Sequence, residues 1–141
     1  MNNIEIKNYL SDHDIKPSLQ RMAVMQFLLA NHVHPTADEV YTALQKEMPM
    51  LSKTTVYNTL KLLVDKGVVL YLTIDEKKAR YDGNTFKHAH LKCLECGNVF
   101  DIPLCDSFKP HEVEQTNGFT ILDTQVYHNG YCNNCLKKKI N

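Results

Sequence analysis

The sequence lacks the features that would mark a membrane protein or an exported protein. No long apolar run is present, so we expect no membrane-spanning helix. The first residues show no signal-peptide pattern, and we therefore expect a cytoplasmic location. Sixteen basic residues balance sixteen acidic residues in a chain of 141. Bulk charge thus does not indicate a nucleic-acid binder, and DNA binding would require local placement of cations, together with a dimer.

Common catalytic motifs are missing as well. The sequence contains neither a glycine-rich phosphate loop nor a serine nucleophile motif, so we expect no enzyme. A zinc-dependent hydrolase would need an open metal position beside a general base. The histidines and aspartates described below resemble such an arrangement, and a hydrolase therefore remains a minor alternative. The length suits one ordinary domain or two small ones.

The sequence does contain two CxxC pairs, Cys93 with Cys96 and Cys132 with Cys135. Two residues between thiolates allow one turn to direct both sulfurs at a metal, and a second turn completes the tetrahedron of a structural zinc site. A redox pair and simple buried thiols are the alternatives. Two pairs without a βαβ pattern favour zinc. Cys105 stands apart and is expected to be a free thiol.

A second set of possible metal ligands consists of nitrogen and oxygen donors. His88 and His90 would share one face of a strand, because alternate strand residues do. Asp101 lies on the next expected strand, Asp82 ends an earlier one, and His34 lies in a turn. Such donors suit Fe(II), Mn(II) or Zn(II), and the first two bind weakly enough for a sensor. The alternative is a group of solvated surface residues.

Residues 1–84 have the pattern of helices followed by a hairpin. Helix, turn, helix and a two-stranded hairpin form a winged helix. We therefore predict a winged-helix domain over 1–82, a hinge at 83–84 and a second domain over 85–141. The expected helices cover about 4–10, 18–29, 36–48 and 52–66, and the expected strands cover 68–74 and 79–82.

The second domain is expected to be a small α/β unit closed by the zinc site. The fold class is accordingly α/β (α+β), with a winged helix-turn-helix and a C-terminal α/β dimerisation domain. Strand-like runs occur at 90–92, 99–102 and 119–127. A helix is expected near 107–116, although Pro110 removes a backbone donor there.

The helix that begins at Ser52 has small polar and basic residues in its first turns, as a DNA recognition helix does. Tyr57 offers a ring for a thymine methyl group, and Asn58 offers an amide for a base edge. An ordinary amphipathic helix is the alternative. Arg80, in the hairpin, is a further candidate phosphate contact. The candidate DNA-contacting residues are Lys16, Arg21, Lys53, Thr54, Thr55, Tyr57, Asn58 and Lys61.

Four ordered blocks of the sequence resemble the ferric uptake regulator family. They are His34–Tyr41, Ser52–Leu60, His88–Gly97 and Gly130–Cys135. The resemblance extends from about Leu10 to Cys135. It implies a homodimeric, metal-dependent repressor whose winged helices bind a palindromic operator in double-stranded DNA, with a regulatory metal between the two domains.

One residue of the resemblance indicates a branch of the family. Iron sensors usually carry Glu a few residues after the first CxxC pair, whereas peroxide sensors carry Asp, as Asp101 does here. Lys87 and Ala89 occupy positions where many iron sensors have further ligands. The chain is therefore similar to the PerR-type, peroxide-responsive branch. That branch implies Fe(II) or Mn(II) held by His34, Asp82, His88, His90 and Asp101.

The resemblance also implies how such a site senses peroxide. Peroxide reacts with bound Fe(II), and a ligand histidine is oxidised, for which the candidates are His34 and His88. Two alternatives remain open. A repressor of iron, manganese or zinc uptake would use the same residues without oxidation. A protein-interaction module stabilised by zinc would bind no specific DNA sequence.

Overall fold

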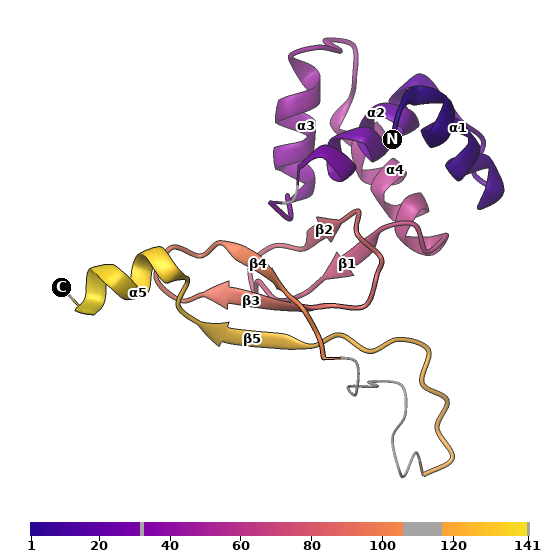
Figure 1. Cartoon of the computed structure of the whole chain (residues 1–141). Helices are drawn as coiled ribbons and strands as arrows, with labels where there is room; N and C mark the ends of the chain where they lie inside the picture. The colour runs from indigo at the N-terminus through magenta and orange to yellow at the C-terminus, as the bar shows by residue number, and fades with distance from the viewer. Residues whose placement is uncertain (32, 106–116, 141) are drawn as a thin grey trace. The chain divides into compact units, whose positions relative to one another are not determined.

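The computed structural model describes residues 1–31, 33–105 and 117–140. The chain divides into two compact units, Met1–Thr85 and Phe86–Asn141. Each unit is described by itself below, with the labels of Figure 1. The helix expected near 107–116, with Pro110, lies outside the described residues. Across the described ranges, the helices are all too short or too polar to cross a membrane.

The N-terminal unit contains four helices and a hairpin of two antiparallel strands (Figure 1). The side chains of Ser18, Thr36 and Ser52 each accept a backbone N–H at a helix start. Such caps satisfy donors that the helix leaves unpaired. The elements are α1 (Asn3–Asp12), α2 (Leu19–Ala30), α3 (Ala37–Gln45), α4 (Lys53–Asp65), β1 (Leu70–Leu72) and β2 (Arg80–Asp82).

The turn from α4 into the hairpin depends on Gly67. Its φ of +76° lies in the left-handed region, which side chains disfavour. The Gly67 N–H donates to the Val64 carbonyl at 2.9 Å, and the Val68 N–H donates to the Leu63 carbonyl at 3.0 Å. These bonds satisfy carbonyls at the end of the helix.

One apolar core occupies the N-terminal unit and draws on all four helices and the hairpin. Fully burying an aliphatic side chain stabilises a fold by about 1.5–3 kcal/mol relative to exposure. Burial of this core therefore accounts for the packing of the helices without any bound ion. Its members include Ile6, Leu10, Val24, Met25, Leu28, Val40, Leu44, Val56, Leu60, Leu63, Val68 and Tyr81.

The C-terminal unit contains a three-stranded sheet with β3 (Ala89–Cys93) at its centre. The neighbouring strand β4 (Val99–Ile102) pairs with β3 in the antiparallel direction, and β5 (Tyr127–Gly130) pairs with it in parallel. Helix α5 (Asn133–Ile140) follows β5. The register places His90 opposite Asp101.

One sequence prediction in this unit is wrong, and one helix was not expected. The strand expected over 119–127 begins only at Tyr127, and residues 119–126 belong to no strand, although the His90 N–H donates to the Val126 carbonyl at 3.0 Å. Leu122 is 91% exposed, so apolar residues alone did not make a strand there. Helix α5, which includes Lys137–Lys139, was not predicted from the sequence. These lysines lie in its last turn, where cations interact favourably with the helix dipole.

Candidate metal sites and nucleic-acid surface

Four cysteines of the C-terminal unit form one cluster, in which the sulfur atoms all lie within 4.8 Å of one another. Cys93 ends β3 and Cys96 lies in the turn after it, while Cys132 precedes α5 and Cys135 lies in its first turn. A zinc ion with Zn–S bonds of about 2.3 Å separates the sulfurs of a tetrahedron by about 3.8 Å. The cluster therefore fits a structural zinc ion.

Backbone hydrogen bonds shape the cluster. The Gly97 N–H donates to the Cys93 carbonyl at 2.9 Å, and the positive φ of Gly97 permits this tight turn. The Leu94 N–H donates to the Gly130 carbonyl at 2.8 Å, which links the turn to the end of β5. The Cys132 N–H points at Cys93 Sγ from 3.4 Å. The sheet and these bonds thus hold the two CxxC pairs together.

The thiols of the cluster differ in acidity. Backbone N–H groups of Cys96 and Cys132 lower the pKa of Cys93 to about 6, because they stabilise its thiolate. The hydrogen bond with the Cys132 side chain raises the pKa of Cys135 to about 12. Protons shared among neighbouring sulfurs in this way are released when a metal binds, since only thiolates are good ligands.

In the N-terminal unit, His34 and Asp82 lie side by side and are both buried. The turn that carries His34 is held against β2 by two hydrogen bonds. Arg80 Nη1 donates to the His34 carbonyl at 3.0 Å, and the Tyr81 N–H donates to the Pro35 carbonyl at 2.9 Å. As a result, His34 Nε2 lies 3.4 Å from Asp82 Oδ2. One nitrogen and one oxygen ligand are thus presented together.

The backbone around this pair is unusual at two positions. His34 has a φ of +54°, a conformation that costs energy outside glycine and that clusters at functional sites. Gly83 follows Asp82, and a Cβ there would lie 3.2 Å from the backbone of Leu28. Glycine thus lets the end of β2 approach α2. Arg80 also pairs with Asp75 at 3.3 Å, so its guanidinium helps to hold the turn.

In the C-terminal unit, His88, His90 and Asp101 direct three ligand atoms at one another. The Nε2 atoms of His88 and His90 are 2.9 Å apart, and Asp101 Oδ1 lies 3.2 Å from the first and 3.5 Å from the second. His88 Nδ1 is 2.6 Å from the Phe86 carbonyl, which can only accept a hydrogen bond. Nδ1 therefore carries the proton, and Nε2 presents its lone pair for a metal.

The predicted DNA contacts on α4 form a polar outer face. Val56, Leu60 and Leu63 turn into the core, whereas Lys53, Thr54, Tyr57, Asn58 and Lys61 are exposed and Thr55 is half-buried. This division follows from the helical repeat. The exposed face of α4 therefore presents hydrogen-bonding and cationic side chains that a nucleic acid could contact.

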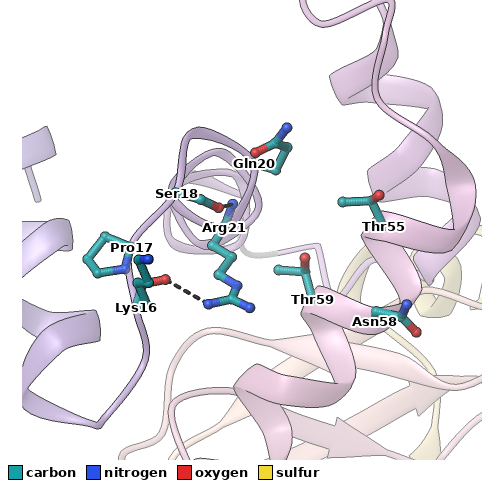
Figure 2. Close-up of a pocket in the computed structure, with 8 residues that line it drawn as sticks. All are labelled: Lys16, Pro17, Ser18, Gln20, Arg21, Thr55, Asn58 and Thr59. Carbon is teal, nitrogen blue, oxygen red and sulfur yellow. Dashed lines mark hydrogen bonds between the residues drawn. The ribbon is translucent and has the colours of Figure 1, made fainter.

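Lys16 and Arg21 line an open cleft of about 450 Å³ with Thr55 and Asn58 (Figure 2). Arg21 Nη1 donates to the Lys16 carbonyl at 2.8 Å. One cation from the segment before α2 and one from its first turn thus lie beside polar residues of α4. The chemistry of this cleft suits a phosphate group of a nucleic acid.

Sequence reasoning missed one residue of this surface, Asp38. The Tyr57 hydroxyl donates to Asp38 Oδ1 at 2.8 Å, and Lys53 Nζ lies 3.5 Å from the same oxygen. The sequence showed Asp38 only as an acid in the first turn of α3. No spacing rule relates it to residues of another helix, so only the packing of α3 against α4 reveals the contact.

Comparison with known proteins agrees with this architecture. The sequence profile described as the ferric uptake regulator family matches residues 12–129. The peroxide-responsive repressor PerR of Staphylococcus saprophyticus is 35% identical over 135 residues, which cover 92% of this chain and 88% of that protein. PerR of Staphylococcus epidermidis is 36% identical over 143 residues, covering 88% and 91%.

A solved structure gives the same result at the level of the fold. The Campylobacter jejuni peroxide stress regulator superposes with a TM-score of 0.69 at 28% identity, over 96% of this chain and 100% of that one. The profile, the relatives and the succession of a helical unit and a four-cysteine unit along the chain agree. The chain belongs to the ferric uptake regulator family, which consists of metal-dependent transcriptional regulators and not of enzymes.

Proposed function

We propose that this protein is a homodimeric repressor that binds operator DNA when metal-loaded and releases it in response to hydrogen peroxide. The proposal depends mainly on one observation, the presence of an aspartate, Asp101, beside His88 and His90. Its carboxylate meets the Nε2 atoms of His88 and His90, and peroxide sensors of the family are expected to have aspartate there. The similarity to repressors named peroxide-responsive supports the same branch. Such a regulator acts in the cytoplasm, where the DNA is.

The donor set of the C-terminal unit supports redox chemistry. Two imidazoles and one carboxylate are the ligands with which many non-haem proteins hold Fe(II) while leaving positions open for an oxidant. The hydrogen bond from His88 Nδ1 to the Phe86 carbonyl fixes the ring with Nε2 directed at Asp101. Because the ring of His88 is already oriented, metal binding does not have to pay the entropy of fixing it.

We further propose that His34 and Asp82 bind the same Fe(II) or Mn(II) ion as His88, His90 and Asp101. The family resemblance supports this assignment. The three donors of the C-terminal unit would leave positions open on such an ion, and His34 and Asp82 would fill two of them. An ion held by both units stabilises the arrangement of the dimer that fits two half-sites of the operator. Its differential affinity for that arrangement couples metal binding to DNA binding.

Fe(II) held at this site would activate peroxide, so that one peroxide oxygen is added to a ligand imidazole, which loses two electrons overall, while the other oxygen leaves as water. His34 and His88 are the two candidates for oxidation. The turn that carries His34 is fixed by the hydrogen bond from Arg80 to the His34 carbonyl. The ring of His88 is oriented by its hydrogen bond to the Phe86 carbonyl. An oxidised imidazole donates less well to a metal. Oxidation of either residue therefore weakens the site and releases the operator.

On the DNA side, we assign base and phosphate contacts to the exposed face of α4, with Lys53, Thr54, Thr55, Tyr57, Asn58 and Lys61. Lys16 and Arg21 are assigned to phosphates beside it. The zinc ion on Cys93, Cys96, Cys132 and Cys135 stays bound throughout and maintains the C-terminal unit. Its four thiolates leave no open position for a substrate.

The test compares protein from aerobic cells grown with excess iron and with excess manganese. Mass spectrometry of the peptides that contain His34 and His88 is expected to show one added oxygen in the iron sample alone. DNA binding by the manganese sample is expected to survive peroxide. Unmodified histidines in the iron sample, together with tight metal-dependent DNA binding, would instead support a repressor of metal uptake.

A further inference from the structure

We propose that Asp38 is a positioning residue that holds Tyr57 and Lys53 of α4 in the orientation that reads DNA. The inference rests on the proposed DNA-binding function and deepens it. Asp38 lies in the first turn of α3, outside the helix that carries the predicted contacts. Its role is to restrict two side chains of the neighbouring helix.

A single carboxylate oxygen makes both contacts. Asp38 Oδ1 accepts the Tyr57 hydroxyl at 2.8 Å and lies 3.5 Å from Lys53 Nζ. Lys53 and Tyr57 are one helical turn apart and therefore lie on the same face of α4. The contact thus gathers the two exposed side chains at the N-terminal end of α4, where a recognition helix meets base edges and phosphates.

A second residue of α3 completes the arrangement. The Lys53 ammonium lies 5.7 Å from the centre of the Tyr41 ring, within the range of a cation–π interaction. Asp38 and Tyr41 are also one turn apart, on α3. Helices α3 and α4 bury side chains such as Val40 and Val56 in the same core. The backbone of Asp38 is therefore held by packing, and its carboxylate provides a fixed reference point for α4.

The need for such a residue follows from the exposure of Tyr57, which is 43% accessible. An exposed side chain samples several rotamers, and fixing one costs entropy at the moment of binding. The hydrogen bond selects one orientation in advance. It also lowers the pKa of Asp38 and raises the pKa of Tyr57, because the neutral phenol donates to the ionised carboxylate.

The carboxylate also has an electrostatic cost, since it lies where DNA phosphates approach and Lys53 neutralises it only in part. Asp38 is therefore expected to increase discrimination between base pairs and to reduce overall affinity. Removing the charge and removing the hydrogen bond should have different effects. This difference allows the proposal to be tested with two substitutions at one position.

The experiment uses the full-length, manganese-loaded protein. Duplexes are first selected from a random-sequence library by the wild type, and affinities are then measured for the selected duplex and for each of its single base-pair variants. Asp38→Ala should reduce discrimination at one base pair in each half-site by about fivefold at most, the range for exposed ion pairs. Asp38→Asn keeps an acceptor oxygen, so discrimination should survive while all duplexes bind more tightly.

Two further variants isolate the contact. Tyr57→Phe should reduce discrimination as Asp38→Ala does, and combining the two should add nothing, since both remove one interaction. Glu39→Gln is the matched control, because it neutralises the other acid in the first turn of α3 and should leave discrimination unchanged.

Other results would overturn the proposal. They are unchanged discrimination in Asp38→Ala, equal losses in Asp38→Ala and Asp38→Asn, or additive effects with Tyr57→Phe. If the manganese-loaded wild type selects no sequence at all, the DNA-binding function itself is wrong, and the role of Asp38 fails with it. Selection by the wild type with unaffected variants contradicts only the role of Asp38.

Discussion

The two units of this chain bury different kinds of side chain. The N-terminal unit encloses one cluster of apolar residues that runs from Ile6 to Tyr81. Among the described residues of the C-terminal unit, the buried apolar side chains are Ala89, Cys93, Val99 and Cys135. Two of these four belong to the cysteine cluster. Hydrophobic burial thus stabilises the first unit, whereas metal coordination must replace much of that contribution in the second.

The largest expected effect comes from Cys96→Ser. Structural zinc contributes about 10–16 kcal/mol of apparent binding free energy to small domains, and few buried apolar residues compensate for it here. We expect loss of zinc, of the C-terminal fold and of the dimer, with the helices of the N-terminal unit retained. Zinc content, size-exclusion chromatography and circular dichroism measure these three outcomes.

The matched control is Cys105→Ser, because Cys105 is exposed and lies outside the cluster. This variant should keep its zinc and remain a dimer. A stable, zinc-free dimer of Cys96→Ser would show that the C-terminal unit does not depend on metal coordination for its stability.

A smaller effect is expected from Leu60→Ala in the other unit. Leu60 is fully buried, and replacing a buried leucine by alanine costs about 2–5 kcal/mol through lost burial and a cavity. Denaturant unfolding of the zinc-loaded protein should show this loss. The zinc content of Leu60→Ala should equal that of the wild type. If this variant also lost zinc, the two units would not be stabilised independently of each other.

Asp101→Ala separates the proposed sensing ligands from the four cysteines. Removing this carboxylate should weaken Mn(II) binding by at least about tenfold, judging from the effects of lesser changes around metal sites. Titration calorimetry measures that affinity, and zinc content should stay that of the wild type. His128→Ala, on the neighbouring strand β5, is the control. Equal Mn(II) affinity in Asp101→Ala and wild type would remove Asp101 from the site.

The smallest effect concerns the titration of Tyr57. Its pKa is raised above the ordinary value of 10.0, first by the hydrogen bond to Asp38. Ionising the phenol breaks that bond and places two negative charges together, so Asp38→Asn should lower the pKa of Tyr57. Tyrosinate absorbance of the two proteins measures the difference. Burial is the first cause that raises the pKa of Tyr81, ahead of the charges of Tyr71 and Tyr57, so Tyr81 should respond to the substitution less than Tyr57 does.

Local features of the sequence predicted much of the fold. Ser18, Thr36 and Ser52 identified helix starts because a cap and the donor it satisfies are three residues apart. The two CxxC pairs indicated their cluster for a similar reason, since each pair needs only one turn. The histidines at 88 and 90 were likewise related by the alternation of a strand.

Features that depend on distant partners were not predictable in this way. The run before Tyr127 has strand-forming residues, but among the described residues only Val126, at its end, is shown bonded to β3, and pairing along its length decides whether a strand forms. The left-handed conformation of His34 arises from bonds to β2. The contact of Asp38 with Tyr57 arises from helix packing. In each case the decisive interaction joins segments that sequence spacing does not relate.

The most direct test of the account is the affinity of the protein for its selected duplex as Mn(II) is added and then removed, with zinc content measured in the same samples. The account predicts that tight binding appears with Mn(II) and is lost when it is removed, while zinc remains on the cysteines. The same affinity with and without Mn(II) would contradict it.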